Sequence, residues 1–357
     1  DKRFFTATGK AQFIAVSHQA PLSLSTKSYP FILNSGRIRD QWHTMTRTGL
    51  SSRLSAHKAE PFVEMNELDA KTAKLSEGDL VQLSNEYGEA VVRVNISAQI
   101  KPGQLFMPIH WNKTTASQAS VCALIKPNLD TSSGQPEFKH TPVKIEKWQY
   151  HSEALLLTRK PLDLSKFTYW VKQKVASGYL YRIADDHGSS ALMNKCAQLL
   201  QLEKGKNLSY SPGSDSAQPI YRYANIQAQK IQSAYIVGDN LQQQELEWLQ
   251  GLLDEQVDDA IERSLISGRI EGKLAAGKII CACKQIGINS IKNAIQEQQL
   301  DSVAAISEFT GAGTGCGTCL SEVEAILLQH PAEQDIKQQA DTPPAKSQHN
   351  PVQYFTF

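Results

Sequence analysis

Four of the six cysteines form two tight pairs toward the end of the chain. The first pair is Cys281-Ala282-Cys283 and the second is Cys316-Gly317-Thr318-Cys319. Thiolates two or three residues apart can bind the same ion or cluster without help from distant parts of the fold. The four cysteines therefore predict a metal centre, which is either an iron–sulfur cluster or a structural zinc ion.

The residues around the second pair favour a [2Fe-2S] cluster over zinc. The run GAGTGCGTC supplies four glycines, Gly311, Gly313, Gly315 and Gly317, which carry no side chain to keep backbone N–H groups away from cluster sulfurs. Such donors stabilise a negatively charged cluster. A C-x-C spacing is unusual for a zinc ribbon, and the run lacks the Lys-Ser/Thr ending of a phosphate-binding loop. We also expect Cys319 to begin a helix, whose free amides favour a thiolate.

The composition restricts the class of protein. Lysine and arginine number 37 against 36 acidic residues, which gives a formal net charge of +1. This near balance of charges gives no reason to expect nucleic acid or an anionic membrane as a partner. No stretch approaches the roughly 18 apolar residues of a membrane span, and the start lacks the pattern of a signal peptide. Six cysteines do not make a disulfide scaffold in a chain this long, and the clustered thiols indicate a reducing, cytoplasmic location. We expect Cys122 and Cys196 to be small buried residues.

A second group of polar residues lies in the run NSGRIRDQWHTMTRTGL. Its hydrogen-bond donors are Ser35, Arg37, Thr44, Thr46, Arg47 and Thr48. Gly36 permits close approach of a ligand, Arg37 suits bidentate phosphate recognition, and Trp42 or His43 can stack on a flat ring. Such a loop fits a large cofactor that carries a diphosphate and aromatic rings. The same composition also suits an ordinary solvated loop.

The pattern of apolar residues predicts a mixed α/β multidomain chain of two or three domains. We expect an N-terminal arm at 1–28, a β-rich domain at 29–150, an α/β middle region at 151–265, a cysteine-bearing domain at 266–330 and a disordered tail at 331–357. The β-rich region suggests a compact barrel. Its expected strands are Phe31–Leu33, Leu80–Leu83, Ala90–Ile96, Leu105–Ile109 and Val143–Ile145, with a helix at Asn66–Leu75. The middle region has expected strands at Ala154–Leu157, Tyr179–Ile183 and Ala234–Val237, and expected helices at Phe167–Val175, Ala191–Leu202 and Gln244–Leu253.

Two family resemblances refine these expectations. The arrangement of CAC, a helix-bearing stretch and GAGTGCGTC over about 275–330 resembles the bacterioferritin-associated-ferredoxin-like (BFD-like) [2Fe-2S] domain, a small helical domain. The resemblance implies that all four cysteines, Cys281, Cys283, Cys316 and Cys319, ligate the cluster.

The other resemblance covers the β-rich domain. The segments SGRIRDQWHTMTRT, EPFVEMNELDAKTAKLSEGDLVQLSNEYGEAVVRV, KPGQLFMPIHW and SGQPEFKHTPVKIEK are similar to the molybdopterin-dinucleotide-binding domain of the molybdopterin oxidoreductases. That family has a double-psi β-barrel. The resemblance implies that one dinucleotide is lined by Ser35, Gly36, Arg37, Trp42, His43 and Thr44, and that Lys139 touches its pterin or phosphate groups. Cys122 departs from the family, which usually has Asn there, so one polar contact is in doubt unless a neighbour such as Asn128 supplies it. Asp130-Thr131 is a second departure, since the family often has Asp-Pro at this place.

A [2Fe-2S] domain after this barrel is typical of bacterial assimilatory nitrate reductases, which the chain resembles in their C-terminal part. The resemblance implies molybdenum bis-molybdopterin guanine dinucleotide, a [2Fe-2S] cluster here, and a [4Fe-4S] cluster in an upstream part. It further implies nitrate as substrate and an electron-donor protein or reductase subunit as partner. We expect no catalytic residue in this chain, and no nitrate turnover by it alone. The alternatives are a formate dehydrogenase-like molybdopterin oxidoreductase and a non-catalytic iron–sulfur electron-transfer protein.

Overall fold

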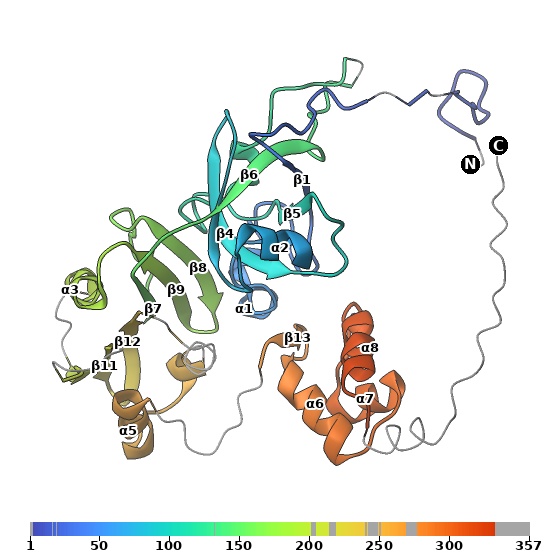
Figure 1. Ribbon diagram of the computed structural model, residues 1–357. Helices are drawn as coiled ribbons and strands as arrows, with labels where there is room; N and C mark the ends of the chain where they lie inside the picture. The colour runs from blue at the N-terminus through green and yellow to red at the C-terminus, as the bar shows by residue number, and fades with distance from the viewer. Residues whose placement is uncertain are drawn as a thin grey trace, which may run out of the picture.

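Six strands close into a barrel in the first half of the protein, as the computed structural model shows (Figure 1). The structure describes residues 3–15, 17–18, 20–131, 133–200, 205–213, 219–239, 241, 249, 251–268 and 277–332. The barrel strands are β1 (Phe31–Gly36), β2 (Phe62–Met65), β3 (Leu80–Ser84), β4 (Glu89–Ile96), β5 (Gln104–Pro108) and β6 (Thr141–Lys147). They are arranged in the order β1-β5-β2-β4-β3-β6, with β1 parallel to β5 and β2 parallel to β4. The expected barrel is confirmed, and β2 is a strand that we did not predict.

The barrel core explains which residues became strands. Leu33, Leu80, Leu83, Val92 and Leu105 are among its fully buried side chains, and neighbouring residues such as Val81 and Val91 are buried as well. Helix α2 (Glu67–Ala73) confirms the expected helix. It begins at the Asn66 cap, whose side chain accepts a hydrogen bond from the Leu68 amide.

The segment between β1 and β2 contains only short helical turns, η1 (Thr48–Leu50) and α1 (Ser52–Ser55). Its backbone is held in the left-handed region at Asp40, His43 and Met45, with φ of 71°, 43° and 63°. Non-glycine residues rarely adopt this conformation, and they persist in it where surrounding contacts fix it. This segment, residues 37–50, is called the dinucleotide loop below, after the expectation from the family resemblance that it lines the dinucleotide.

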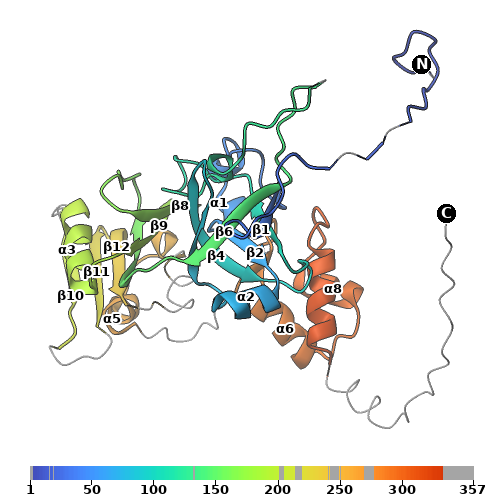
Figure 2. The same ribbon diagram turned by 45° about the horizontal axis from the view of Figure 1, so that its top comes forward.

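A second sheet of six antiparallel strands packs beside the barrel (Figures 1 and 2). Its strands are β7 (Ser152–Thr158), β8 (Tyr169–Val175), β9 (Gly178–Asp185), β10 (Lys206–Tyr210), β11 (Ile220–Gln227) and β12 (Lys230–Gly238), in the order β10-β11-β12-β7-β9-β8. Helix α3 (Ser189–Leu200) covers one face, and α5 (Asp259–Ser267) with η3 (Leu252–Asp254) covers the other. The expected helix at Ala191–Leu202 is thereby confirmed for its described residues. The expected helix at Gln244–Leu253 lies largely outside the described residues.

The expected helix at Phe167–Val175 is wrong, because Tyr169–Val175 is strand β8. Its burial alternates strictly, with Tyr169, Val171, Gln173 and Val175 buried and the residues between them partly exposed. A period of two is the pattern of a strand. Pairing with β9 along the whole length of β8 fixes this conformation.

The cysteines belong to a small unit with its own core. A short hairpin, β13 (Ile279–Cys281) and β14 (Ile286–Gly287), precedes the helices α6 (Ile288–Glu297), α7 (Val303–Thr310) and α8 (Leu320–Gln329). Ile280, Ile291, Ile306, Val323 and Ile326 form its apolar centre. The mainly helical character of this unit agrees with the expectation.

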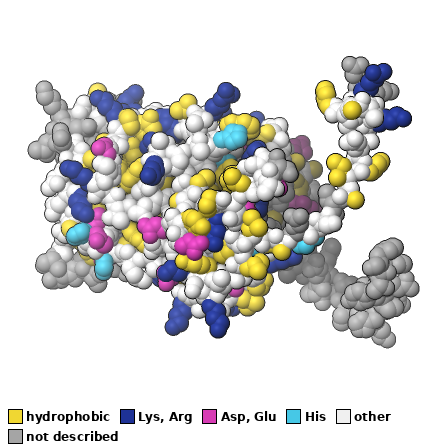
Figure 3. Space-filling model, turned by 90° about the horizontal axis from the view of Figure 1, so that it is seen from above, with side chains coloured by type: hydrophobic (Ala, Val, Ile, Leu, Met, Phe, Trp, Pro, Cys, Tyr) yellow, Lys and Arg dark blue, Asp and Glu magenta, His cyan; other side chains and the backbone are white. Residues whose placement is uncertain are grey.

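The surface carries both signs of charge over the face seen in Figure 3, where basic and acidic side chains are interspersed. The described part of residues 3–28 extends from the body and exposes Phe4, Phe5, Phe13 and Ile14. Within the described residues, no helix combines the length and the apolar character needed to cross a bilayer. The expected disordered tail at 331–357 lies outside the described residues from position 333 onward.

Candidate cofactor and cluster site

The four paired cysteines come together at one end of the helical unit. Cys281 ends strand β13, and Cys283 lies in the turn that follows it. Cys316 lies in the glycine-rich loop after α7, and Cys319 is the N-cap residue of α8, as the sequence predicts. Cys281 and Cys319 are 1% exposed, whereas Cys283 is half-buried and Cys316 exposed. The site therefore has an inner and an outer pair of thiols.

The sulfur positions suit a binuclear cluster better than one zinc ion. Cys283 Sγ lies 3.7 Å from Cys281 Sγ and 3.9 Å from Cys316 Sγ. A tetrahedral Zn–S₄ site places every pair of sulfurs about 3.8 Å apart. These cysteines are all described, and no three of their sulfurs lie within 4.8 Å of one another. These sulfurs therefore do not form the compact tetrahedron that a single zinc ion requires.

Backbone amides from the glycine-rich loop reach the inner thiols. Burial raises the pKa of Cys281, but hydrogen bonds from the backbone of Gly313 and Lys284 outweigh it and hold that pKa below its usual value. Burial, together with neighbouring Cys281, raises the pKa of Cys319 to about 11, although Gly313 also points its amide there. Gly313 thus supplies the kind of N–H donor that the glycine pattern predicted.

A close approach explains another glycine. A Cβ at Gly315 would lie 2.8 Å from Cys283 Sγ, closer than real Cβ contacts occur. The loop can therefore pass over the outer thiols only if residue 315 is glycine. Thiol donors, amide donors and this clearance together fit a [2Fe-2S] cluster.

Three of the residues expected at the dinucleotide gather where β1 ends. The Ser35 hydroxyl donates to the Phe138 carbonyl at 2.7 Å, and Lys139 donates its ammonium to the Ser35 carbonyl. A Cβ at Gly36 would lie 2.8 Å from the Phe106 ring. The exposed Lys139 thus stands beside a backbone that a ligand can approach closely.

The other expected residues lie next along the dinucleotide loop. The Arg37 guanidinium lies 5.8 Å from the centre of the Trp42 ring, and the ring of His43 meets the same indole edge-on at 4.4 Å. Thr44 is exposed, and its carbonyl accepts from Asn112 at 3.1 Å. The indole of Trp42 is 49% exposed, so it presents a surface on which a flat ring can stack.

His110 shapes this loop, although no pattern in the sequence singled it out. Its Nε2 accepts from the Ile38 amide at 3.0 Å, and its Nδ1 faces the His43 carbonyl. Burial lowers the pKa of His110, so the neutral ring is favoured, with Nδ1–H donating to His43 and Nε2 accepting. The only sequence signal was its place directly after strand β5 in the segment KPGQLFMPIHW.

Cys122 lies outside both β1 and the dinucleotide loop. It lies in the turn η2 (Val121–Ala123), and the expectation that it is buried is wrong, because its side chain is exposed. The buried side chains at this turn are those of Val121 and Leu124. Asn128, the possible substitute, donates to Ser23 at 2.9 Å and to Glu137 at 3.0 Å. Cys196, by contrast, is buried as expected.

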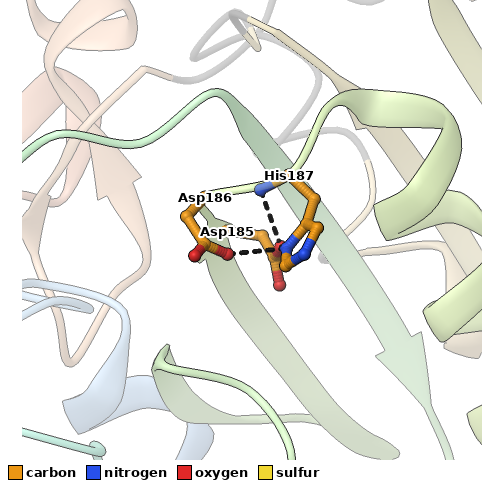
Figure 4. Close-up of side chains that lie close together, drawn as sticks. All are labelled: Asp185, Asp186 and His187. Atoms are coloured by element: carbon orange, nitrogen blue, oxygen red, sulfur yellow. Dashed lines mark hydrogen bonds and ion pairs between the residues drawn. The ribbon is translucent and has the colours of Figure 1, made fainter.

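A second cluster of possible ligand atoms occurs where β9 ends, at Asp185, Asp186 and His187 (Figure 4). The Asp185 carboxylate accepts from Lys195 at 2.7 and 3.0 Å and lies 2.8 Å from His187 Nδ1. Lys195 and His187 already provide the countercharge and hydrogen bonds that this buried carboxylate needs. The group is an anchor between β9 and helix α3.

Comparisons with known proteins match these two regions. Residues 31–142 match the molydopterin dinucleotide binding domain, and residues 279–329 match the BFD-like [2Fe-2S] binding domain. The chain thus resembles the C-terminal part of a molybdopterin-dependent nitrate reductase. It carries a dinucleotide-binding barrel and a [2Fe-2S]-binding unit, as the sequence predicts.

Individual relatives support this resemblance to different extents. A nitrate reductase of Klebsiella oxytoca is 32% identical over 323 residues, which is 89% of this chain and 36% of that protein. The F420-dependent formate dehydrogenase subunit alpha of Methanocaldococcus jannaschii is 37% identical over 145 residues, 41% of this chain and 21% of that protein. The assimilatory nitrate reductase catalytic subunit of Bacillus subtilis is 31% identical over 138 residues, 38% of this chain and 19% of that protein. The chain therefore spans about a third or less of the length of these relatives.

Proposed function

We propose that this chain serves a molybdenum-dependent nitrate reductase of the assimilatory type, in which it binds part of the molybdopterin guanine dinucleotide cofactor and relays electrons. The observation that carries the proposal is the presence of both sites in one chain: four cysteines around a glycine-rich loop, and a barrel with an exposed, strained dinucleotide loop. The match to the Klebsiella oxytoca nitrate reductase extends over 89% of the chain.

The residues have separate tasks in this proposal. Cys281, Cys283, Cys316 and Cys319 hold the cluster, and Gly313 directs an amide toward the inner sulfurs. Ser35, Gly36, Arg37, Trp42, His43, Thr44 and Lys139 line one dinucleotide, with Cys122 at its edge. When bound, the cofactors supply one-electron transfer and the two-electron, two-proton reduction of nitrate to nitrite and water. A [4Fe-4S] cluster elsewhere in the full protein, an electron-donor partner and a cytoplasmic location belong to the same proposal.

A formate dehydrogenase-like enzyme is the second candidate. It is favoured by one observation, the higher identity of the Methanocaldococcus jannaschii subunit over a shorter segment. That match covers 41% of the chain, whereas the nitrate reductase match covers 89%. Assays of the full-length protein with nitrate and with formate separate the two candidates. This chain alone is expected to turn over neither substrate.

The cluster is tested on the chain purified without oxygen. We expect two irons and two acid-labile sulfides per chain, and a visible absorption band that Cys316→Ser abolishes. Cys122→Ser is the matched control, because Cys122 is also exposed but lies outside the cysteine cluster, and it should leave the iron content unchanged. Stoichiometric zinc, or a spectrum that survives Cys316→Ser, would contradict the assignment.

A further inference from the structure

One arginine of the dinucleotide loop reaches the cluster unit. Arg39 Nη2 donates to the Ile280 carbonyl at 2.9 Å and to Glu322 Oε2 at 2.8 Å. Ile280 directly precedes the ligand Cys281, and Glu322 lies in the first turn of α8, just after Cys319. Arg39 therefore binds next to both inner thiols at once. Figure 1 shows β13 and α8 on the side of the barrel that carries α1.

Neighbouring groups fix the direction in which Arg39 points. Its Nη1 lies 3.2 Å from Asp40 Oδ2, and its Nη2 lies 2.8 Å from His57 Nε2. His57 Nδ1 in turn lies 3.1 Å from Asp40 Oδ2, and the side chain of His57 is only 4% exposed. Three side chains of the barrel thus form a closed ring of contacts. An arginine held in this way reaches across the interface without losing much further rotamer freedom.

The position of Arg39 in the sequence connects the two sites. It lies two residues after Arg37 and three before Trp42, between the side chains expected to face the dinucleotide. Arg37 is exposed, whereas Arg39 is only partly so. The intervening Ile38 donates its amide to the buried His110, so the backbone is fixed between the two arginines. A shift at Arg39 must therefore move the dinucleotide loop or break these contacts.

The charge of Arg39 also faces a site that gains negative charge. Each electron accepted by a cluster makes it more negative, and a nearby fixed positive charge favours the reduced state. Asp40 and Glu322 are the nearest opposing charges, and Arg39 offsets part of their effect. Removing the arginine leaves the Glu322 carboxylate next to the inner thiols and the Asp40 carboxylate near Cys316 without this positive charge.

We propose that Arg39 is a positioning residue that docks the [2Fe-2S] unit onto the dinucleotide loop and raises the reduction potential of the cluster. The inference rests on the proposed function, because it requires the cluster to be present. It adds an internal connection that neither family match assigns. The interaction joins one side chain of the barrel to one backbone carbonyl and one carboxylate of the cluster unit.

Two variants separate the docking role from the charge. Arg39→Gln removes the positive charge and the link to Glu322, and Glu322→Gln removes the negative charge from the same link. Both should increase hydrogen–deuterium exchange at 279–283 and 320–326. The reduction potential, followed by the cluster's paramagnetic signal, should fall in Arg39→Gln and rise in Glu322→Gln. Arg39→Lys should restore most of the potential but little of the exchange protection, since an ammonium lacks the fork of a guanidinium.

Two matched controls lie close by. Arg53→Gln removes an exposed positive charge from α1, and Glu324→Gln removes an exposed negative charge from α8. Neither should change exchange at the interface. An Arg39→Gln variant indistinguishable from Arg53→Gln in exchange and in potential would overturn the proposal. Potentials that move in the same direction in Arg39→Gln and Glu322→Gln would overturn its electrostatic part.

Iron content distinguishes this proposal from the proposed function. All variants are measured in the full chain and should retain two irons. If the unmodified chain binds no iron, the electron-relay function fails. If iron is bound normally but Arg39→Gln changes nothing, only the docking role fails.

Discussion

The barrel contacts its two neighbours in different ways. Against the second sheet it shares one apolar core, since Tyr169, Val171 and Ala184 pack in the same cluster as Leu33 and the other barrel residues. The cluster unit instead has a core of its own. Its hydrogen bonds to the barrel come from polar side chains, chiefly Arg39. The second sheet therefore shares part of its apolar core with the barrel, whereas the cluster unit is joined to the barrel through polar contacts.

The ion pairs at the two interfaces also differ, because those between barrel and sheet are more deeply buried. Between barrel and sheet, Glu60 accepts from Arg93 at 3.3 Å and lies 3.4 Å from Arg182, whose side chain is 7% exposed. Arg93 also donates to Glu153 of β7 at 2.6 Å. At the cluster unit, the Glu322 side chain is 38% exposed. Removing one partner of a buried ion pair strongly destabilises a protein, whereas an exposed ion pair contributes little to the free energy of unfolding.

The largest expected effect is therefore at Glu60. Glu60→Gln leaves Arg93 and Arg182 near each other without the carboxylate, and should destabilise the barrel and sheet by roughly 3–5 kcal/mol. Denaturant unfolding followed by tryptophan fluorescence measures it, with separate transitions for separate units. Glu67→Gln is the control, because its pair with Lys71 is 66% and 72% exposed. Equal stability of the two variants would remove the distinction between the interfaces.

A smaller effect is expected at Tyr169. Its hydroxyl donates to Glu60 Oε1 at 3.3 Å across the same interface, and its ring packs on Trp148. Tyr169→Phe keeps the ring and removes one hydrogen bond to a charged group, which should cost about 1.5 kcal/mol. Tyr87→Phe, at a 49% exposed tyrosine, should be neutral in the same denaturation measurement. A neutral Tyr169→Phe would show that this hydrogen bond contributes nothing to the stability of the interface between barrel and sheet.

The smallest effect is a pH dependence at the cluster unit. Burial raises the pKa of Glu322, but His57, Arg39 and Lys278 lower it more, so this pKa lies below its ordinary value of 4.5. Because the folded pKa is the lower one, the contribution of Glu322 is complete above the unfolded value and is lost as pH falls through the folded one. Exchange at 320–326, corrected for its intrinsic pH dependence, should rise on acidification below about 4.5.

The control for this pH dependence is again a neighbouring carboxylate. Glu322→Gln should abolish the additional exchange, and Glu324→Gln should leave it in place. The same acidification is expected to leave the shared core of barrel and sheet folded over a wider range of pH. If β8 lost its protection against exchange at a higher pH than α8, the barrel and sheet would be less resistant to acid than the cluster unit, contrary to this prediction.

Local patterns in the sequence predicted much of the fold. Apolar, β-rich runs predicted strands such as Leu80–Leu83 and Ala90–Ile96, and a helix was expected at Asn66–Leu75, where α2 lies. Phe167–Val175 failed because Tyr, Trp and Val satisfy a helical face as well as a strand, and only the partner strand β9 decides between them. Strand β2 was missed because four residues are too short to show a period.

The cysteines were predictable for a similar reason. Their spacing along the chain already places the two thiols of each pair together, and Gly315 lies in the same run as the second pair. The contacts of Arg39 were not predictable, because His57, Ile280 and Glu322 are 18, 241 and 283 residues away along the chain. Nothing local distinguishes Arg39 from Arg37, although they face different surroundings. The same holds for His110, whose partner His43 is 67 residues away.

The unequal exposure of the four thiols also has a consequence for how the protein matures and ages. Cys316 is exposed and Cys283 is half-buried, while Cys281 and Cys319 are buried. Iron and sulfide that enter the folded unit from solvent reach Cys316 first, because it is the exposed thiol. Oxidants reach the same side first, so damage begins at Cys316. Cluster insertion and oxidative damage therefore both start from the same side of the site, the side of the glycine-rich loop.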